Sequence, residues 1–107
     1  MPNGEDRNLR RMLWTLEAYR IKYGEWPTRL LVERDTWPSV EHYLTPEQLS
    51  SLRAHLEIIL DAPEVPYDSF FVAEGPAGSL GYRGPTLESD RERVSFSEWL
   101  GDPWRRY

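Results

Sequence analysis

The side chains that most often do acid–base or metal chemistry are scarce in this sequence. Two histidines are present, His42 and His55, and each has carboxylates close by in the chain. A histidine beside a carboxylate can act as a general base or bind a metal ion. No second histidine stands at a ligand spacing such as H-x-x-x-H, and the sequence contains no cysteine. We therefore expect both histidines to be solvated or structural, and we predict no catalytic residue, metal site or cofactor.

Glycine recurs at every third residue at Gly75, Gly78, Gly81 and Gly84, a spacing that invites comparison with phosphate-binding loops. Such a loop binds phosphate because it leads into a helix N-terminus, where backbone N–H groups point at the anion. Here the glycines fall within and after a predicted hairpin turn, so turns and bulges account for them. The sequence also lacks G-x-S-x-G, P-loop and G-x-G-x-x-G signatures.

The net charge of −5 is concentrated in one part of the chain. Residues 1–53 and 83–107 each contain equal numbers of acidic and basic side chains, so the excess lies in residues 54–82. That segment has no Lys or Arg, and its acidic side chains are Glu57, Asp61, Glu64, Asp68 and Glu74. Such a zone could attract a basic partner or mimic nucleic-acid phosphates, or it could be a solvated sheet edge where carboxylates discourage aggregation.

Arginines and aromatic rings are the other candidates for binding. The chain ends in Trp104-Arg105-Arg106-Tyr107, a pattern that could stack on nucleobases or contact phosphate. The same tail could instead anchor the end of the chain on the body of the protein. The acidic balance provides no basic footprint, so we expect nucleic acid to be an improbable partner. The arginines that would serve it are Arg10, Arg11, Arg105 and Arg106.

Hydrophobic periodicity predicts a long first helix that begins near Asp6 or Asn8 and ends at Gly24. Its core stripe recurs at steps of three and four residues and comprises Leu9, Met12, Leu13, Leu16, Tyr19 and Tyr23. Gly24 can adopt the positive φ of a helix C-terminus, and Pro27 cannot continue a helix. We therefore expect Trp26, just after the end of this helix, to fold back as a lid on the core.

Trp14, Ala18 and Ile21 fall on the opposite side of this helix, at about 120–180° from Leu9. An amphipathic helix with solvent behind it should not place Trp and Ile there. The face could be a partner surface with a Trp anchor and an arginine rim, a common composition at binding hot spots. It could instead be covered by the C-terminal helix, or serve self-association. The candidate partner-binding residues are Trp14, Ile21, Arg7, Arg10 and Arg11.

The rest of the chain predicts short strands and two further helices. Four runs have the length and composition of strands: 29–34, 57–60, 69–74 and 79–83. The run 57–60 could also be the last turn of a helix, because periodicity cannot decide over four residues. The motif "TPEQ" at Thr45 is a capping box with proline at the first helical position, and it opens a helix near 45–57. The motif "SFSE" at Ser95 predicts a second capping box and a short C-terminal helix.

These elements predict one α+β domain over residues 1–107. Two main helices and a short C-terminal helix should pack on a mainly antiparallel sheet of three or four strands. We expect a frayed N-terminus at 1–6, an exposed loop at 84–94 and a C-terminal tail at 102–107. The first residues have no apolar h-region and the apolar runs are too short to span a bilayer, so we expect a cytoplasmic protein with no membrane partner.

Residues 9–83, with "GEWPT", "LTPEQL" and "FFVAEG", resemble small bacterial and phage-encoded proteins, and this resemblance implies no activity. The leading hypothesis is a non-enzymatic protein-binding module: an adaptor, a subunit of a larger complex, or a small inhibitor of a host protein that a phage or mobile element could encode. Homo-oligomerisation stays open. A nucleic-acid-associated protein is the second hypothesis, and a small hydrolase or transferase around His42 or His55 is the third.

Overall fold

The computed structural model describes residues 7–60, 70–86, 94–105 and 107 of the chain. Its four strands form one mixed sheet in the order β2-β1-β3-β4. They are β1 (Arg29–Val32), β2 (Glu57–Leu60), β3 (Phe71–Gly75) and β4 (Gly78–Gly81). β1 pairs in parallel with β2 and antiparallel with β3, and β4 returns antiparallel to β3. The predicted α+β class is confirmed, and the ambiguous run 57–60 is a strand.

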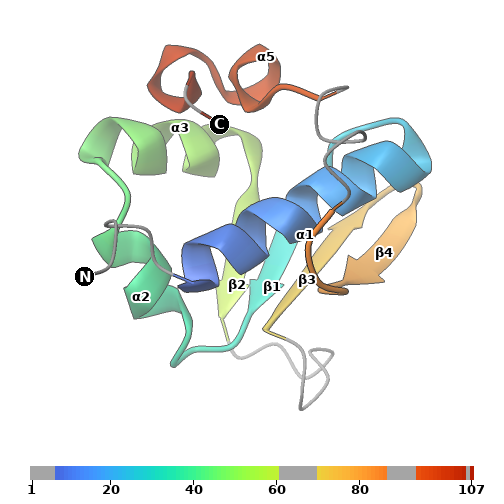
Figure 1. Ribbon diagram of the computed structural model, residues 1–107, viewed down its shortest axis with the longest axis horizontal. Helices are drawn as coiled ribbons and strands as arrows, with labels where there is room; N and C mark the ends of the chain where they lie inside the picture. Colours follow the sequence, from blue (N-terminus) through green and yellow to red (C-terminus); the bar gives the residue numbers. More distant parts are fainter. Residues whose placement is uncertain (1–6, 61–69, 87–93, 106) are drawn as a thin grey trace.

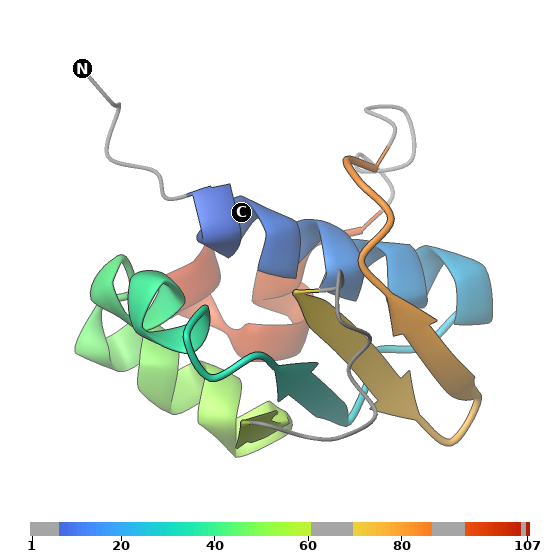
Figure 2. The ribbon, with the colours of Figure 1, turned by 90° about the horizontal axis from the view of Figure 1, so that it is seen from below.

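Four α-helices and one 3₁₀ helix accompany the sheet in the described part of the chain. They are α1 (Arg7–Tyr23), α2 (Trp37–His42), α3 (Pro46–His55), α5 (Phe96–Leu100) and the 3₁₀ helix η1 (Asp102–Trp104). α1 crosses one face of the sheet over β3 and β4, and α5 packs on α3 at one end of the domain (Figures 1 and 2). None of these helices is long and apolar enough to cross a membrane.

The two predicted capping boxes have different outcomes. At the start of α3, the Thr45 hydroxyl accepts the Gln48 backbone N–H at 3.1 Å, and the Gln48 side chain accepts the Thr45 N–H at 2.9 Å. This box is confirmed. At the start of α5 the predicted box is wrong, because the Ser95 side chain makes no capping hydrogen bond. Its hydroxyl is instead 2.8 Å from the hydroxyl of Ser97.

The core lies between α1 and the facing side of the sheet. The predicted α1 stripe is buried from Leu9 to Tyr19, and Tyr23 packs against it partly exposed. The sheet and the other helices complete the core with Leu30, Val32, Trp37, Val40, Leu52, Leu56, Phe71, Ala73, Leu80, Phe96, Leu100 and Trp104. Trp26 packs against this cluster as predicted, and its ring stacks on that of Trp99 with centroids 4.5 Å apart.

Strand register also defines the opposite face of the sheet. Side chains alternate between faces, so the residues between the core positions line the other side in rows across the strands. One row is apolar: Leu31 stands between Ile59 and Val72. The next row is polar, and in it Arg29 stands between Glu57 and Glu74.

Two tyrosines fix the end of α1 on the β3–β4 hairpin. The rings of Tyr19 and Tyr23 lie 4.6 Å apart, and the Tyr23 hydroxyl donates to the Ser79 carbonyl at 3.1 Å. A Cβ added at Gly75 would lie 2.5 Å from the Tyr19 hydroxyl oxygen, and one at Gly78 would lie 2.8 Å from that of Tyr23. These two hairpin glycines therefore make room for the tyrosine hydroxyls. The regular glycine spacing is attributed above to turns and bulges alone, and this close approach is a second reason for Gly75 and Gly78.

Candidate functional site

A row of stacked side chains lies on the back of α1. The Trp14 indole stacks on the Tyr82 ring, with centroids 6.5 Å apart and planes at 18°. Tyr82 makes an edge contact with Phe70 at 6.2 Å, and the Arg11 guanidinium lies over the Phe70 ring, 4.2 Å from its centroid. Both ring separations are within the range of favourable aromatic pairs. We call these four side chains, Arg11, Phe70, Tyr82 and Trp14, the aromatic ladder.

Three parts of the chain position the aromatic ladder. Arg11 and Trp14 are three residues apart on α1 and therefore neighbours on its surface. Phe70 stands directly before β3 and Tyr82 directly after β4. Because these strands are antiparallel neighbours, the start of one lies beside the end of the other. The Tyr82 N–H donates to the Phe71 carbonyl at 2.9 Å, which holds the two rings side by side.

The segment after β4 covers part of the back of α1. Residues 82–86 run across the helix (Figures 1 and 2), and the Thr86 hydroxyl donates to the Glu17 carboxylate at 3.5 Å. Part of the predicted exposed loop at 84–94 is therefore packed, while residues 87–93 are outside the described residues. All four ladder side chains remain partly exposed. The cover is thus incomplete, and it leaves an aromatic surface.

The C-terminal helix does not supply this cover, contrary to one of the three explanations given above for the apolar back of α1. The rings of Phe96 and Trp99 on α5 lie against Trp26, at 5.3 and 4.5 Å between centroids. Hydrogen bonds hold this region to α3: the Ser51 hydroxyl donates to the Leu100 carbonyl. The aromatic ring that meets Trp14 instead comes from the segment after β4.

The predicted partner-binding residues share this side of the molecule. Arg7 and Arg10 are exposed at the N-terminal end of α1, and Ile21 is partly exposed nearer its C-terminal end. Arg11 is partly buried, and besides stacking on Phe70 it donates to the Asn8 side chain at 3.0 Å. The structure therefore gathers the arginine rim and the Trp anchor on one helix face, as the spacing predicted.

The acidic zone is less free than its sequence suggests. Arg29 lies 3.5 Å from a carboxylate oxygen of Glu57 and 3.5 Å from one of Glu74, so two of the five acids share one cation. Arg29 precedes the acidic segment in the chain, and only strand pairing brings it there. The other three acids, Asp61, Glu64 and Asp68, are outside the described residues. A hollow of about 420 Å³ beside this row is lined partly by Arg29, Glu74 and the hairpin glycines.

The C-terminal tail folds onto the body, so its role as an exposed binding strip is wrong for Trp104. That side chain is 0% exposed, and its indole N–H donates to the Gln48 carbonyl at 3.1 Å. Tyr107 packs against it with ring centroids 5.5 Å apart. Arg105 is exposed and lies 3.9 Å from Asp102, and Arg106 is outside the described residues. The tail is therefore largely an anchor, which was the second of its two explanations.

The histidines lie on different helices, and each makes an aromatic contact. His42 is exposed beside the Tyr43 ring, with centroids 5.0 Å apart. His55 is also exposed; its Nδ1 is 3.0 Å from the Ser51 carbonyl, and its ring meets the edge of Trp99. The part of the chain that the structure describes contains no group of three or more His, Asp or Glu that could hold a metal ion.

Sequence reasoning missed two members of the aromatic ladder, Phe70 and Tyr82. Both stand at strand ends, where propensity assigns them simply to the sheet. The predicted hairpin did contain the necessary signal, because an antiparallel pairing across residues 75–78 sets the residue before one strand beside the residue after the other.

Comparison of the chain with family models, with curated proteins and with solved structures gave no match. The assignment of a function therefore rests on the chemistry of the aromatic ladder and its rim.

Proposed function

We propose that this protein is a non-enzymatic protein-binding module whose contact surface is the aromatic ladder. The observation that supports this most directly is the row itself: three partly exposed aromatic rings and one guanidinium, each in contact with the next. Trp, Tyr and Arg supply a large share of binding energy at interfaces, because they bring wide, rigid contact area together with polar groups. The module could act as an adaptor, a complex subunit or a small inhibitor of a host protein.

The partner's chemistry follows from the residues around the ladder. Arg7 is exposed beside it, so a complementary surface would carry a carboxylate at its edge and an apolar pocket for Trp14. We place this interaction in the cytoplasm, which the absence of cysteine fits.

Binding to nucleic acid has weaker support than binding to protein. Trp104, which was proposed to stack on bases, is buried. Arg11, one of the arginines proposed to contact phosphate, already places its guanidinium over the Phe70 ring. The basic residues that remain belong to a protein with a net charge of −5, which opposes association with phosphate.

The test is affinity capture from the host lysate with three forms of the full chain: wild type, Trp14→Glu, and Tyr43→Glu. Tyr43 is the matched control, because it is an exposed aromatic residue on another part of the surface. We expect wild type and Tyr43→Glu to capture the same stoichiometric protein, with or without nuclease, and Trp14→Glu to lose it. Circular dichroism would establish that each variant is folded.

Two results would contradict the proposal. Capture that survives Trp14→Glu undiminished would remove the ladder as the contact surface. Capture that disappears after nuclease treatment would indicate that the protein binds nucleic acid through its arginines. Such binding should weaken steeply as the salt concentration rises.

A further inference from the structure

β2 is an edge strand whose three apolar residues are not interrupted by a charge or a proline. The sheet order leaves its outer side without a strand neighbour among the described residues. Its sequence, Glu57-Ile58-Ile59-Leu60, contains one charged residue at its start and no proline or lysine. Natural edge strands are commonly interrupted by such residues, because unpaired backbone groups invite another strand. At the other edge of the sheet, the Tyr23 hydroxyl donates a hydrogen bond to the Ser79 carbonyl on β4, so this carbonyl already has a partner.

The backbone groups that face outward on β2 can be identified from one hydrogen bond. The Glu57 N–H donates to the Thr28 carbonyl at 2.9 Å, so Glu57 points its backbone groups inward, toward β1. Successive residues of a strand alternate in this direction. Ile58 and Leu60 therefore direct their N–H and C=O groups away from the sheet. By the same alternation, their side chains share one face, and Ile58 packs against the core from it.

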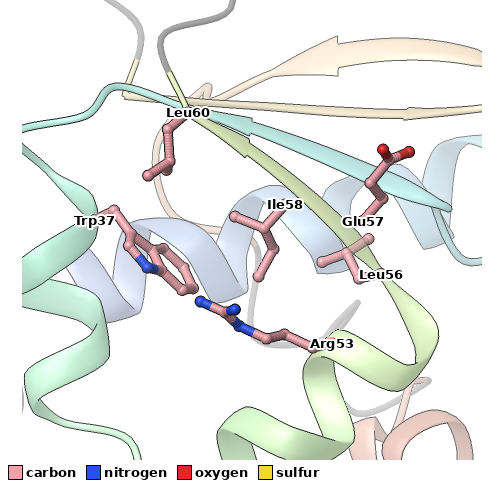
Figure 3. Close-up of a pocket in the computed structure, with 6 residues that line it drawn as sticks. All are labelled: Trp37, Arg53, Leu56, Glu57, Ile58 and Leu60. Carbon is pink, nitrogen blue, oxygen red and sulfur yellow. The ribbon is translucent and has the colours of Figure 1, made fainter.

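A groove with both apolar and charged lining lies beside these two residues. It has a volume of about 320 Å³ and is lined by Trp37, Arg53, Leu56, Glu57, Ile58 and Leu60 (Figure 3). Leu60 is 38% exposed, one of two large hydrophobic side chains with that degree of exposure in the described chain. Figure 3 shows Trp37 toward the Leu60 end of the groove and Arg53 nearer Leu56. The apolar part of the groove, from Trp37 to Leu56, thus continues the apolar surface of the open edge.

We propose that a second copy of this chain occupies this edge, through antiparallel pairing of β2 with β2 about a two-fold axis at Ile59. In this register Ile58 of each copy stands opposite Leu60 of the other. Both are outward-facing residues, so each pair can exchange two backbone hydrogen bonds. The two copies then form one continuous sheet. The same surface on both copies is used, as closed two-fold symmetry requires.

Side-chain chemistry on the groove side favours the same occupant. The register places Ile58 against Leu60 of the second copy on the groove side, so the exposed leucine becomes covered by an apolar neighbour. Glu57 is matched within its own chain by Arg29 at 3.5 Å.

The charges on the helices that flank the groove are also complementary to a second copy. Arg53 lies on α3, which leads into the start of β2, and Glu41 lies on α2, whose Trp37 is near the end of β2. Antiparallel pairing sets α3 of one copy toward α2 of the other, so Arg53 faces Glu41 across the interface. Their side chains are 56% and 44% exposed and are 3.6 Å apart within one chain. They can therefore exchange partners without burying an unmatched charge.

The oligomeric state of the full chain tests this proposal. An interface of this small size should dissociate with a constant between about 10 μM and 1 mM, so sedimentation equilibrium should span that range. We expect a monomer–dimer equilibrium that Leu60→Pro weakens by about 10- to 100-fold, because the variant removes one outward N–H from each copy. Lys22→Glu, which changes an exposed side chain at the end of α1 near the opposite edge strand β4, should leave the equilibrium unchanged.

Amide hydrogen exchange of the wild type supplies a second readout that does not depend on a variant. Protection at Ile58 and Leu60 should rise with protein concentration, whereas protection at Ile59, which faces β1, should not. A monomer at every concentration up to about 1 mM would overturn the proposal. A dimer that persists in Leu60→Pro, or one that Trp14→Glu disrupts, would overturn it as well, because each would place the contact on another surface.

Discussion

The indole N–H of Trp104 donates a hydrogen bond of 3.1 Å to the backbone carbonyl of Gln48. The bond joins the last helical turn of the chain to the first turn of α3. The Gln48 side chain returns a bond to the Pro103 carbonyl at 3.0 Å, and the Ser51 hydroxyl donates to the Leu100 carbonyl. The C-terminal segment is thus fixed to α3 at three points, and Trp104 closes the core between them.

Replacement of Trp104 should therefore be costly. We expect Trp104→Ala to lower the free energy of unfolding by about 3–5 kcal/mol, because a fully buried ring leaves a cavity. Trp104→Phe keeps most of the packing and loses the hydrogen bond to Gln48, so its cost should be smaller. Arg105→Ala, next in the chain and exposed, should change stability by less than about 0.5 kcal/mol. Urea denaturation measures all three, and equal costs at positions 104 and 105 would contradict the core assignment.

The two Ser/Thr motifs at helix starts should differ in their contribution to stability. Thr45→Ala removes a capping bond at 3.1 Å and should cost about 1 kcal/mol. Ser95→Ala removes a hydroxyl that makes no capping bond, and we expect a cost below about 0.5 kcal/mol. Thermal unfolding of the two variants measures both stability costs. A cost at Ser95 as large as that at Thr45 would mean that the second capping box does form.

The close approach of Gly75 to Tyr19 predicts an unusual rescue. Gly75→Ala should destabilise the protein by about 1–3 kcal/mol, because its Cβ would lie 2.5 Å from the Tyr19 hydroxyl oxygen. Tyr19→Phe removes that oxygen, which is buried and makes no hydrogen bond of good geometry with the described residues, so this change alone should cost little. In the double variant the cost of Gly75→Ala should fall. A double-mutant cycle measures the coupling, and strictly additive effects would contradict the clash.

Stability at high pH should report on the same tyrosine. Burial raises the pKa of the Tyr19 hydroxyl above its ordinary value of 10.0, and the charge of Glu25 acts in the same direction. The folded state therefore holds this proton more tightly than the unfolded state does. Its contribution to stability is complete below pH 10 and is lost as the pH rises above that value. Tyr19→Phe should reduce the loss of stability above pH 10; an unchanged pH profile would count against burial as the cause.

Local patterns predicted the parts of this fold whose causes are local. The steps of three and four residues from Leu9 to Tyr19 defined the buried stripe of α1, and the Thr45 motif defined the start of α3. Each depends on a few residues within one or two helical turns. The failure at Ser95 is also physical, because a nearby hydroxyl competed for the side chain that should have capped the helix.

The candidate site depended on contacts that no local pattern contains. Trp14 could be recognised as misplaced on its helix, but the ring that stacks on it comes from Tyr82, far along the chain. In the same way, the acidic zone looked unmatched until strand pairing placed Arg29 between Glu57 and Glu74. Register, rather than composition, decides these neighbours.

The most direct test of the central claim is the affinity of the captured partner, once purified, for wild type and for ladder variants. We predict that Trp14→Ala and Tyr82→Ala each weaken binding by about 30-fold or more, the effect expected at a hot spot. Both residues are partly exposed, so both variants should remain folded, and Tyr43→Ala should bind as wild type does. Affinities of the folded ladder variants within about threefold of wild type would show that the aromatic ladder is not the binding surface.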